Sequence, residues 1–174
     1  QIALHCHFAW PARVRVEAAL HRERPLRHEA GDAEHKRTMR LNEDTVLVGR
    51  RCVLVPYKEK YVERYHAWMQ DDDLLALTAS ERLTLDEEVE NQKSWRDDAK
   101  KLTFIVLDRA QCFGEKDRFP VSAMVGDVNA FLTVPDEPLA AEVDVMVPER
   151  RRRGFGGEAV RLLLRYGREA LSLS

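Results

Sequence analysis

One segment in the second half of the sequence constrains the fold more than any other. The apolar residues 140–147 are typical of a strand, and a charged loop at 148–153 follows them. The glycine-rich residues 154–157 come next, and apolar residues then recur at helical spacing through residues 156–171. The sequence therefore predicts a strand that runs through a basic turn into a helix.

The composition of this turn indicates anion binding. The first turn of a helix leaves backbone N–H groups unpaired and carries a partial positive charge. Glycines allow the backbone to approach an anion closely, and four successive arginines at 150–153 add charged donors. The pattern predicts a phosphate-binding turn. The alternative is a solvated charge run, or a nuclear-localisation patch, beside an ordinary loop. That alternative is less favoured because the two features lie together between a strand and a helix.

A dinucleotide-binding fold is a second alternative, because Gly154, Gly156 and Ala159 fit the GxGxxA pattern. That fingerprint requires the strand to run almost directly into the first glycine. Here the residues 148–153 intervene, and the acidic residue expected about 20 positions later is missing before Ser174. The spacing therefore argues against this fold.

The remaining sequence predicts strands and helices in mixed order. Thr84 and Glu87 form a capping-box pattern at the start of a helix that has few apolar residues and is expected to be peripheral. Gly126 lies inside a strand and indicates a bulge or a close backbone approach. The predicted elements are a strand at 53–55, helices at 61–70 and 85–99, strands at 103–107, 124–132 and 140–147, and a helix at 156–171. The order is β-α-α-β-β-β-α, a mixed α+β fold.

Composition excludes several classes of protein. Hydrophobic residues make up 44% of the chain and charged residues 33%, which suits one packed domain. No apolar run of about 18 residues predicts a membrane span. The three cysteines are too few for a disulfide framework or a CxxC zinc site, and neither Cys52 nor Cys112 has a nearby His and Asp pattern of a thiol nucleophile. The formal net charge of -2 predicts no general attraction to nucleic acid.

The first 38 residues differ from the rest. They hold five of the six histidines and six arginines, with few large aliphatic side chains. Such a stretch buries little apolar area against its ordering entropy. We expect residues 1–38 to be a disordered leader, or an upstream segment outside the native protein, with Met39 as its start. The cluster His5-Cys6-His7 lacks a second pair of ligands, so no metal site is expected.

Arg151-x-x-Gly154-x-Gly156 matches the (Gln/Arg)-x-x-Gly-x-(Gly/Ala) motif, and the chain resembles the GNAT superfamily of acetyl-coenzyme A-dependent N-acetyltransferases. The order of elements matches that superfamily as well. From Met39 to Ser174 the sequence is most similar to the eukaryotic N-acetyltransferase 9 group, near the RimJ/RimL-like enzymes. The segments that carry this resemblance are 39–42, 53–57, 64–66, 68–69, 77–81, 103–108, 124–129, 142–146 and 157–160.

The resemblance implies a mostly antiparallel sheet flanked by helices, with acetyl-CoA as cosubstrate and no metal. Backbone groups near residues 145–147 would bind the pantetheine arm, and one N–H would stabilise the oxyanion. An amine of a protein or peptide, an N-terminal α-amine above all, would attack the thioester directly. The residues implied in cofactor binding are Val145, Met146, Val147, Arg151, Arg152, Arg153, Gly154, Phe155, Gly156, Gly157 and Glu158.

Glu142 and Asp144 are the candidate catalytic residues. They lie two positions apart on one strand, so their carboxylates point to the same face about 7 Å apart. Two carboxylates at that range disfavour simultaneous ionisation, which suits a proton acceptor for the attacking amine. The alternative is an ordinary solvated strand face, and both readings stay open. In relatives, residues 71–73 and 77–83 would line the acceptor end, although a solvated surface suits the aspartates better.

The GNAT fold continues beyond such a helix with a fifth strand, a further helix and two more strands. Residues 39–174 are therefore expected to be the N-terminal two-thirds of the domain, with strand 140–147 left as an open edge. We expect an inactive, aggregation-prone fragment of an N-acetyltransferase of the cytoplasm or the nucleus. The alternative is a non-catalytic CoA-binding or protein-interaction module of the same fold. No nucleic-acid or membrane partner is expected.

Overall fold

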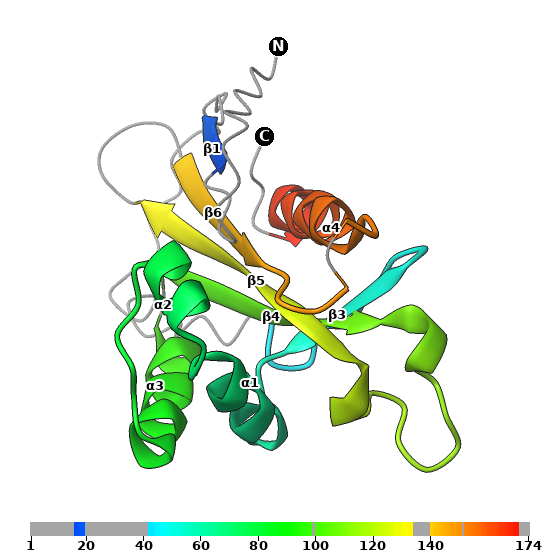
Figure 1. The fold of residues 1–174 in the computed structure, drawn as a ribbon. Coiled ribbons are helices and arrows are strands. Elements are labelled where there is room, and N and C mark those ends of the chain that lie inside the picture. Colours follow the sequence, from blue (N-terminus) through cyan, green and yellow to red (C-terminus); the bar gives the residue numbers. More distant parts are fainter. Residues whose placement is uncertain (1–15, 20–41, 99, 134–139, 151, 171–174) are drawn as a thin grey trace, which may run out of the picture.

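The computed structural model describes residues 16–19, 42–98, 100–133, 140–150 and 152–170. These residues form one six-stranded sheet in which all neighbouring strands are antiparallel, in the order β1-β6-β5-β4-β3-β2 (Figure 1). The strands are β1 Val16–Ala19, β2 Leu47–Val48, β3 Cys52–Pro56, β4 Lys101–Asp108, β5 Met124–Thr133 and β6 Ala140–Met146. The mixed α+β fold with a mostly antiparallel sheet is confirmed.

Helices cover both faces of this sheet (Figure 1). One face carries α4, and the other carries the helices between β3 and β4. The helices are α1 Val62–Trp68, α2 Asp72–Thr78, α3 Leu85–Asp97 and α4 Phe155–Ala170, with short 3₁₀ turns η2 Glu59–Tyr61, η3 Arg109–Gln111 and η4 Val121–Ala123. Each element predicted from the sequence lies within about three residues of an observed one.

Successive apolar side chains along the strands point to alternate faces of the sheet, and they form two hydrophobic cores. In β4, Phe104 and Val106 pack toward α4, whereas Ile105 and Leu107 pack toward α1, and all four are fully buried. The period of two in a strand sends successive side chains to opposite faces. Since every residue of β4 is buried, this strand lies at the centre of the domain.

α2 was not among the predicted helices. The Asp71 carboxylate accepts a 3.0 Å hydrogen bond from the backbone N–H of Leu74 and caps the helix. The acidic run at 71–73 therefore starts a helix, because a side-chain oxygen there satisfies an unpaired N–H of the first turn. α2 has only seven residues, so its apolar residues do not repeat often enough to show a helical period.

α3 begins with the predicted capping box, and most of its residues are exposed, as expected of a peripheral helix. Its buried face is polar, with Glu88 and Gln92 exposing only 2% and 3% of their surface. Gln92 Nε2 donates a 2.6 Å hydrogen bond to the carbonyl oxygen of Tyr57. A search for apolar periodicity misses such a face, because its burial depends on a partner that β3 supplies.

β1 lies inside the segment 1–38 and pairs with the first half of β6. Its register runs from Val16 opposite Val143 to Ala19 opposite Ala140. β6 is therefore covered over 140–143, which corrects the expectation of an open edge along the whole strand. The rest of segment 1–38 lies outside the described residues. Among the described residues, no strand pairs with the outer edge of β6 beyond Val143.

The close approach predicted at Gly126 is confirmed. The β4–β5 register shifts between Val106 and Leu107, next to Gly126 on β5. A Cβ on Gly126 would overlap the carbonyl oxygen of Met146 and would lie 3.0 Å from Val147 Cα. The glycine thus lets β5 touch the end of β6, where the chain turns toward α4.

Candidate functional site

The turn between β6 and α4 has an unusual backbone. Arg150, Arg152 and Gly154 have positive φ angles of 53°, 63° and 82°. A turn that passes through left-handed backbone conformations can point successive peptide N–H groups to one side, which makes a concavity suited to an anion. A Cβ on Gly156 would lie 3.4 Å from Val147 Cγ2, so the start of α4 packs close to the end of β6. The arrangement suits a phosphate group.

Side-chain contacts with α1 and with the end of β4 hold this turn. Glu149 Oε1 accepts hydrogen bonds from Arg64 Nη2 at 2.6 Å and from Trp68 Nε1 at 2.9 Å. Arg150 forms an ion pair with the buried carboxylate of Asp108. Positive φ at a residue other than glycine costs about 1–3 kcal/mol and persists where neighbours fix it. Sequence reasoning missed these contacts because the partners lie on α1 and at the end of β4.

Glu149→Ala tests the contact between the turn and α1. The change removes the acceptor of both Arg64 and Trp68, and we expect the free energy of unfolding to fall by about 1–2 kcal/mol. Glu149→Gln keeps one acceptor oxygen and should recover part of that loss. Urea denaturation measures the change, with the exposed Glu63→Ala on α1 as control. Equal midpoints for E149A and E63A would contradict a stabilising role.

The predicted cofactor-binding residues fall into three groups. Arg151 lies outside the described residues. Arg152, Arg153, Gly154 and Gly157 are exposed around the turn, and Val147 and Gly156 are half-buried. Val145, Met146 and Phe155 are buried at 6%, 4% and 7% exposure, so their side chains belong to the core. Val145 and Met146 also line the smaller of the two cavities described below.

The Glu158 side chain has partners in another segment of the chain, and the cofactor contact that the resemblance implies for this residue stays a prediction. Its carboxylate accepts backbone hydrogen bonds from Arg50, Arg51 and Cys52 at 2.9, 2.7 and 2.9 Å. The side chain therefore attaches the β2–β3 turn to α4. Burial, together with the nearby Glu158 carboxylate, raises the pKa of the Cys52 thiol to about 12. A protonated, buried thiol does not serve as a nucleophile.

Asp144 belongs to a buried polar layer on the face that α1 and α3 cover. It is 7% exposed and lies opposite Asn129 on β5. Asn129 Nδ2 donates to Asp127 Oδ2 at 2.6 Å, and its Oδ1 accepts from Thr103 Oγ1 at 2.7 Å. Glu142 is half-buried and shares this face with Asp144, because the two are separated by one residue of β6.

A small cavity opens beside this polar layer. It has a volume of about 50 Å³ and is lined by Asp127, Asn129 and Asp144 together with Thr78 and Ser80. A larger cavity of about 240 Å³ lies between the 56–59 segment and α3. The larger cavity contains none of the predicted site residues. The smaller one therefore marks the candidate acceptor side, since it adjoins the end of β6.

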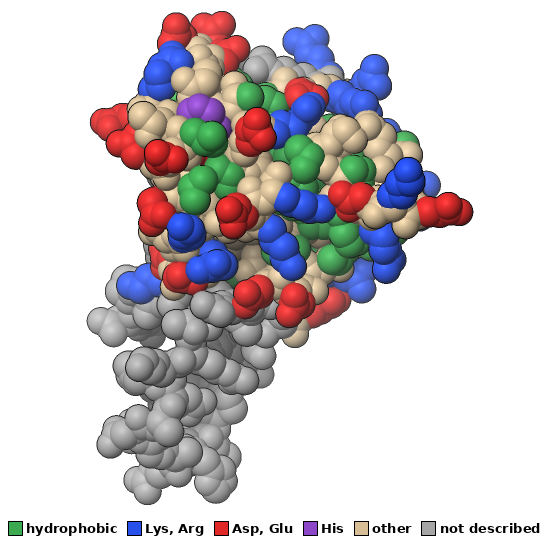
Figure 2. All heavy atoms as spheres, turned by 90° about the horizontal axis from the view of Figure 1, so that it is seen from below, with side chains coloured by type: hydrophobic (Ala, Val, Ile, Leu, Met, Phe, Trp, Pro, Cys, Tyr) green, Lys and Arg blue, Asp and Glu red, His purple; other side chains and the backbone are tan. Residues whose placement is uncertain are grey.

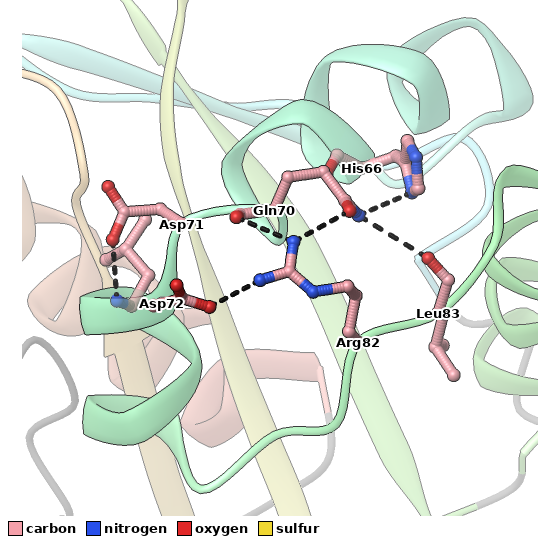
Figure 3. Close-up of polar contacts among 7 residues, drawn as sticks. His66, Gln70, Asp71, Asp72, Arg82 and Leu83 are labelled. Carbon is pink, nitrogen blue, oxygen red and sulfur yellow. Dashed lines mark hydrogen bonds and ion pairs between the residues drawn. The ribbon is translucent and has the colours of Figure 1, made fainter.

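Arg82, in the loop after α2, contacts Gln70 and Asp72 (Figure 3). Its Nη1 donates to the carbonyl oxygen and Oε1 of Gln70 at 2.8 and 3.0 Å, and its Nη2 pairs with the Asp72 carboxylate. Gln70 Nε2 also lies 3.3 Å from His66 Nδ1. These contacts tie the loop after α2 to the end of α1 and the start of α2.

Charged side chains of both signs lie interspersed on the face of the molecule that is seen from below in Figure 2. Within the described part of the chain, no helix is both long and apolar enough to cross a bilayer. The described residues also contain no group of three or more His, Cys, Asp or Glu side chains arranged to hold a metal ion.

Comparison with known proteins identifies the class. Residues 51–174 match the family model described as acetyltransferase (GNAT) domain, so the chain belongs to the GNAT acetyltransferase family. A solved GCN5-related N-acetyltransferase from Brucella melitensis has a similar fold, with a TM-score of 0.55 at 20% identity. That likeness covers 74% of this chain and 57% of the solved chain.

Within the family, the chain is similar to N-acetyltransferase 9 proteins. The mouse alpha/beta-tubulin-N-acetyltransferase 9 is 48% identical over 138 residues, which cover 78% of this chain and 57% of the mouse protein. The Drosophila melanogaster protein of the same name is 50% identical, covering 74% of this chain and 65% of the relative. The N-acetyltransferase 9-like protein of Nematostella vectensis is 47% identical, with 74% and 66% covered. The chain thus spans about three-fifths of the length of these relatives.

Proposed function

We propose that the protein is an acetyl-CoA-dependent N-acetyltransferase that acts on a protein amine, and on an N-terminal α-amine in particular. The observation that carries the proposal is the turn between β6 and α4, with three positive φ angles and exposed arginines, in a chain of this family. The mouse and Drosophila relatives have tubulin in their names, which supports a protein as acceptor.

The residues present suit the phosphates of acetyl-CoA. Gly154 has a φ of 82°, and Gly156 brings the start of α4 against Val147, so the N–H groups of the first turn lie at the end of β6. The exposed Arg152 and Arg153 add positive charge. When bound, the cosubstrate supplies the acetyl group as a thioester. These residues would hold its diphosphate.

The end of β6 would orient the reacting group. Beyond Val143, the outer edge of β6 extends past β1, and its backbone can bind an extended ligand as an added strand does. Asp144 and Glu142 would accept the proton that the attacking amine must lose. The Asp127–Asn129–Thr103 contacts fix the polar layer around Asp144 and keep its surroundings rigid.

The test of this function uses the full-length product of the gene that encodes this chain. We expect it to acetylate peptides with free N-termini, and we expect the double variant Asp144→Asn, Glu142→Gln to reduce kcat by about a hundredfold or more. The affinity for CoA should stay unchanged, because neither side chain belongs to the turn before α4. The exposed Asp86→Asn on α3 serves as control.

Two results would contradict the proposal. Unchanged turnover in the double variant would remove the carboxylates from the mechanism. Binding of CoA without any acetylated product in the full-length protein would favour a non-catalytic binding module.

A further inference from the structure

A basic side chain from the β2–β3 turn lies on the turn that precedes α4. The Arg51 side-chain atoms Cδ, Nε and Cζ would be 3.7, 3.7 and 4.0 Å from a Cβ placed on Gly154. Arg51 Nη1 also donates to the carbonyl oxygen of Arg153 at 3.4 Å. The guanidinium of Arg51, which is distant in the sequence, therefore lies beside Gly154, the glycine with the positive φ angle.

The position of Arg51 is fixed by its backbone and its neighbours. The Arg51 N–H donates to Glu158 Oε2 at 2.7 Å, which attaches the residue to the first turn of α4. A Cβ on Gly49 would lie 2.9 Å from Leu162 Cδ1, so the β2–β3 turn packs tightly against α4. Arg109 Nη1 donates to the carbonyl oxygen of Gly49 at 2.9 Å. These contacts fix the main chain from which the Arg51 side chain extends.

The charge of the turn makes this position useful. Arg150 is engaged by the buried Asp108 carboxylate, so its charge is balanced within the protein. The Arg51 guanidinium presents five N–H donors in a planar fork, and the long bond to Arg153 leaves capacity for another acceptor. Planar forks of this kind match the paired oxygens of a phosphate.

We propose that Arg51 binds the diphosphate of acetyl-CoA together with the turn before α4. This inference rests on the proposed function and deepens it, because it adds a binding residue from outside the Arg151–Gly156 motif. The motif supplies backbone N–H groups and charge from one segment, and Arg51 would supply a guanidinium from the other side of Gly154. Arg51 would then act on cosubstrate binding and not on acceptor binding.

Isothermal titration calorimetry with CoA on the full-length protein tests the proposal. We expect Arg51→Ala to raise the Kd for CoA about tenfold, as loss of a charged hydrogen bond would. Arg51→Lys should give an intermediate Kd, because it keeps the charge without the fork. Arg168→Ala removes an equal charge from the last turn of α4, about 20 Å away along the helix, and should leave the Kd unchanged.

Dephospho-CoA, which lacks the 3′-phosphate, identifies the phosphate involved. If Arg51 serves the diphosphate, R51A weakens CoA and dephospho-CoA by the same factor. A loss confined to CoA would assign the guanidinium to the 3′-phosphate and overturn the proposal. Wild-type affinity of R51A for both ligands, with an unchanged melting temperature, would also overturn it while the proposed function stands. Absence of CoA binding by the wild-type protein would reject the proposed function itself.

Discussion

Gly126→Ala should lower the free energy of unfolding by about 3 kcal/mol or more, a loss large enough to unfold a domain of ordinary stability. The new Cβ would overlap the carbonyl oxygen of Met146 and press on Val147. Both obstacles are backbone atoms of a neighbouring strand, so no side-chain rotation can relieve the overlap. The strands β5 and β6 would have to separate at the end that carries the candidate site.

Chemical denaturation monitored by circular dichroism measures this effect, with Gly157→Ala as the matched control. A Cβ on Gly157 would meet only the flexible end of Arg161, at 3.6 Å, inside α4. Alanine suits a helix interior better than glycine, so G157A should be neutral or stabilising by up to about 1 kcal/mol. Similar stabilities for G126A and G157A would show that β5 and β6 do not approach as described.

Glu158→Ala should also have a large effect, and we expect it to lower the free energy of unfolding by about 2–3 kcal/mol at neutral pH. The variant removes the acceptor of three backbone N–H groups, from Arg50, Arg51 and Cys52. The loss should detach the β2–β3 turn from α4. In contrast, Glu169→Ala removes an exposed partner of Arg165 on the same helix and should cost less than about 1 kcal/mol.

The contribution of Glu158 should depend on pH in one direction. Burial raises the pKa of the Glu158 carboxyl, but hydrogen bonds from the backbone of Arg51, Arg50 and Cys52 outweigh it and hold the pKa below its usual value. A carboxyl group whose pKa is lowered in the folded state stabilises the protein at pH values above its unfolded pKa of about 4.3. That stabilisation is lost as the pH falls through the folded pKa. The stability difference between wild type and E158A should therefore shrink below about pH 4.

Thermal denaturation of both proteins between pH 3 and pH 7 measures that difference. A constant gap across the range would mean that the carboxylate charge contributes nothing, and that only the shape of the side chain matters. A gap that grows on acidification would contradict the direction of the pKa shift.

Local patterns determined most of the elements. Apolar runs rich in β-branched residues located β3, β4 and β6, because such side chains suit a pleated, buried surface. Thr84 and Glu87 located the start of α3 through a capping box that needs only four neighbouring residues. The motif from Arg151 to Gly156 indicated the family, and the family match confirms it.

Features that depend on distant partners were missed. The buried polar face of α3 forms because Gln92 donates a hydrogen bond to the Tyr57 carbonyl oxygen. The spacing of apolar residues does not predict that contact. β1 exists through its pairing with Ala140–Val143 of β6, and its composition resembles that of an unfolded segment.

The sequence by itself determined a strand, a basic glycine-rich turn and a helix, since these follow from local spacing and backbone preferences. Only the tertiary structure decided which side chains serve that turn. In the structure, Glu158 binds the β2–β3 turn, Glu149 binds α1, and Arg51 lies beside Gly154. Each of these contacts joins segments that lie far apart in the chain. Long-range contacts of this kind depend on how the sheet and helices pack, which no local pattern encodes.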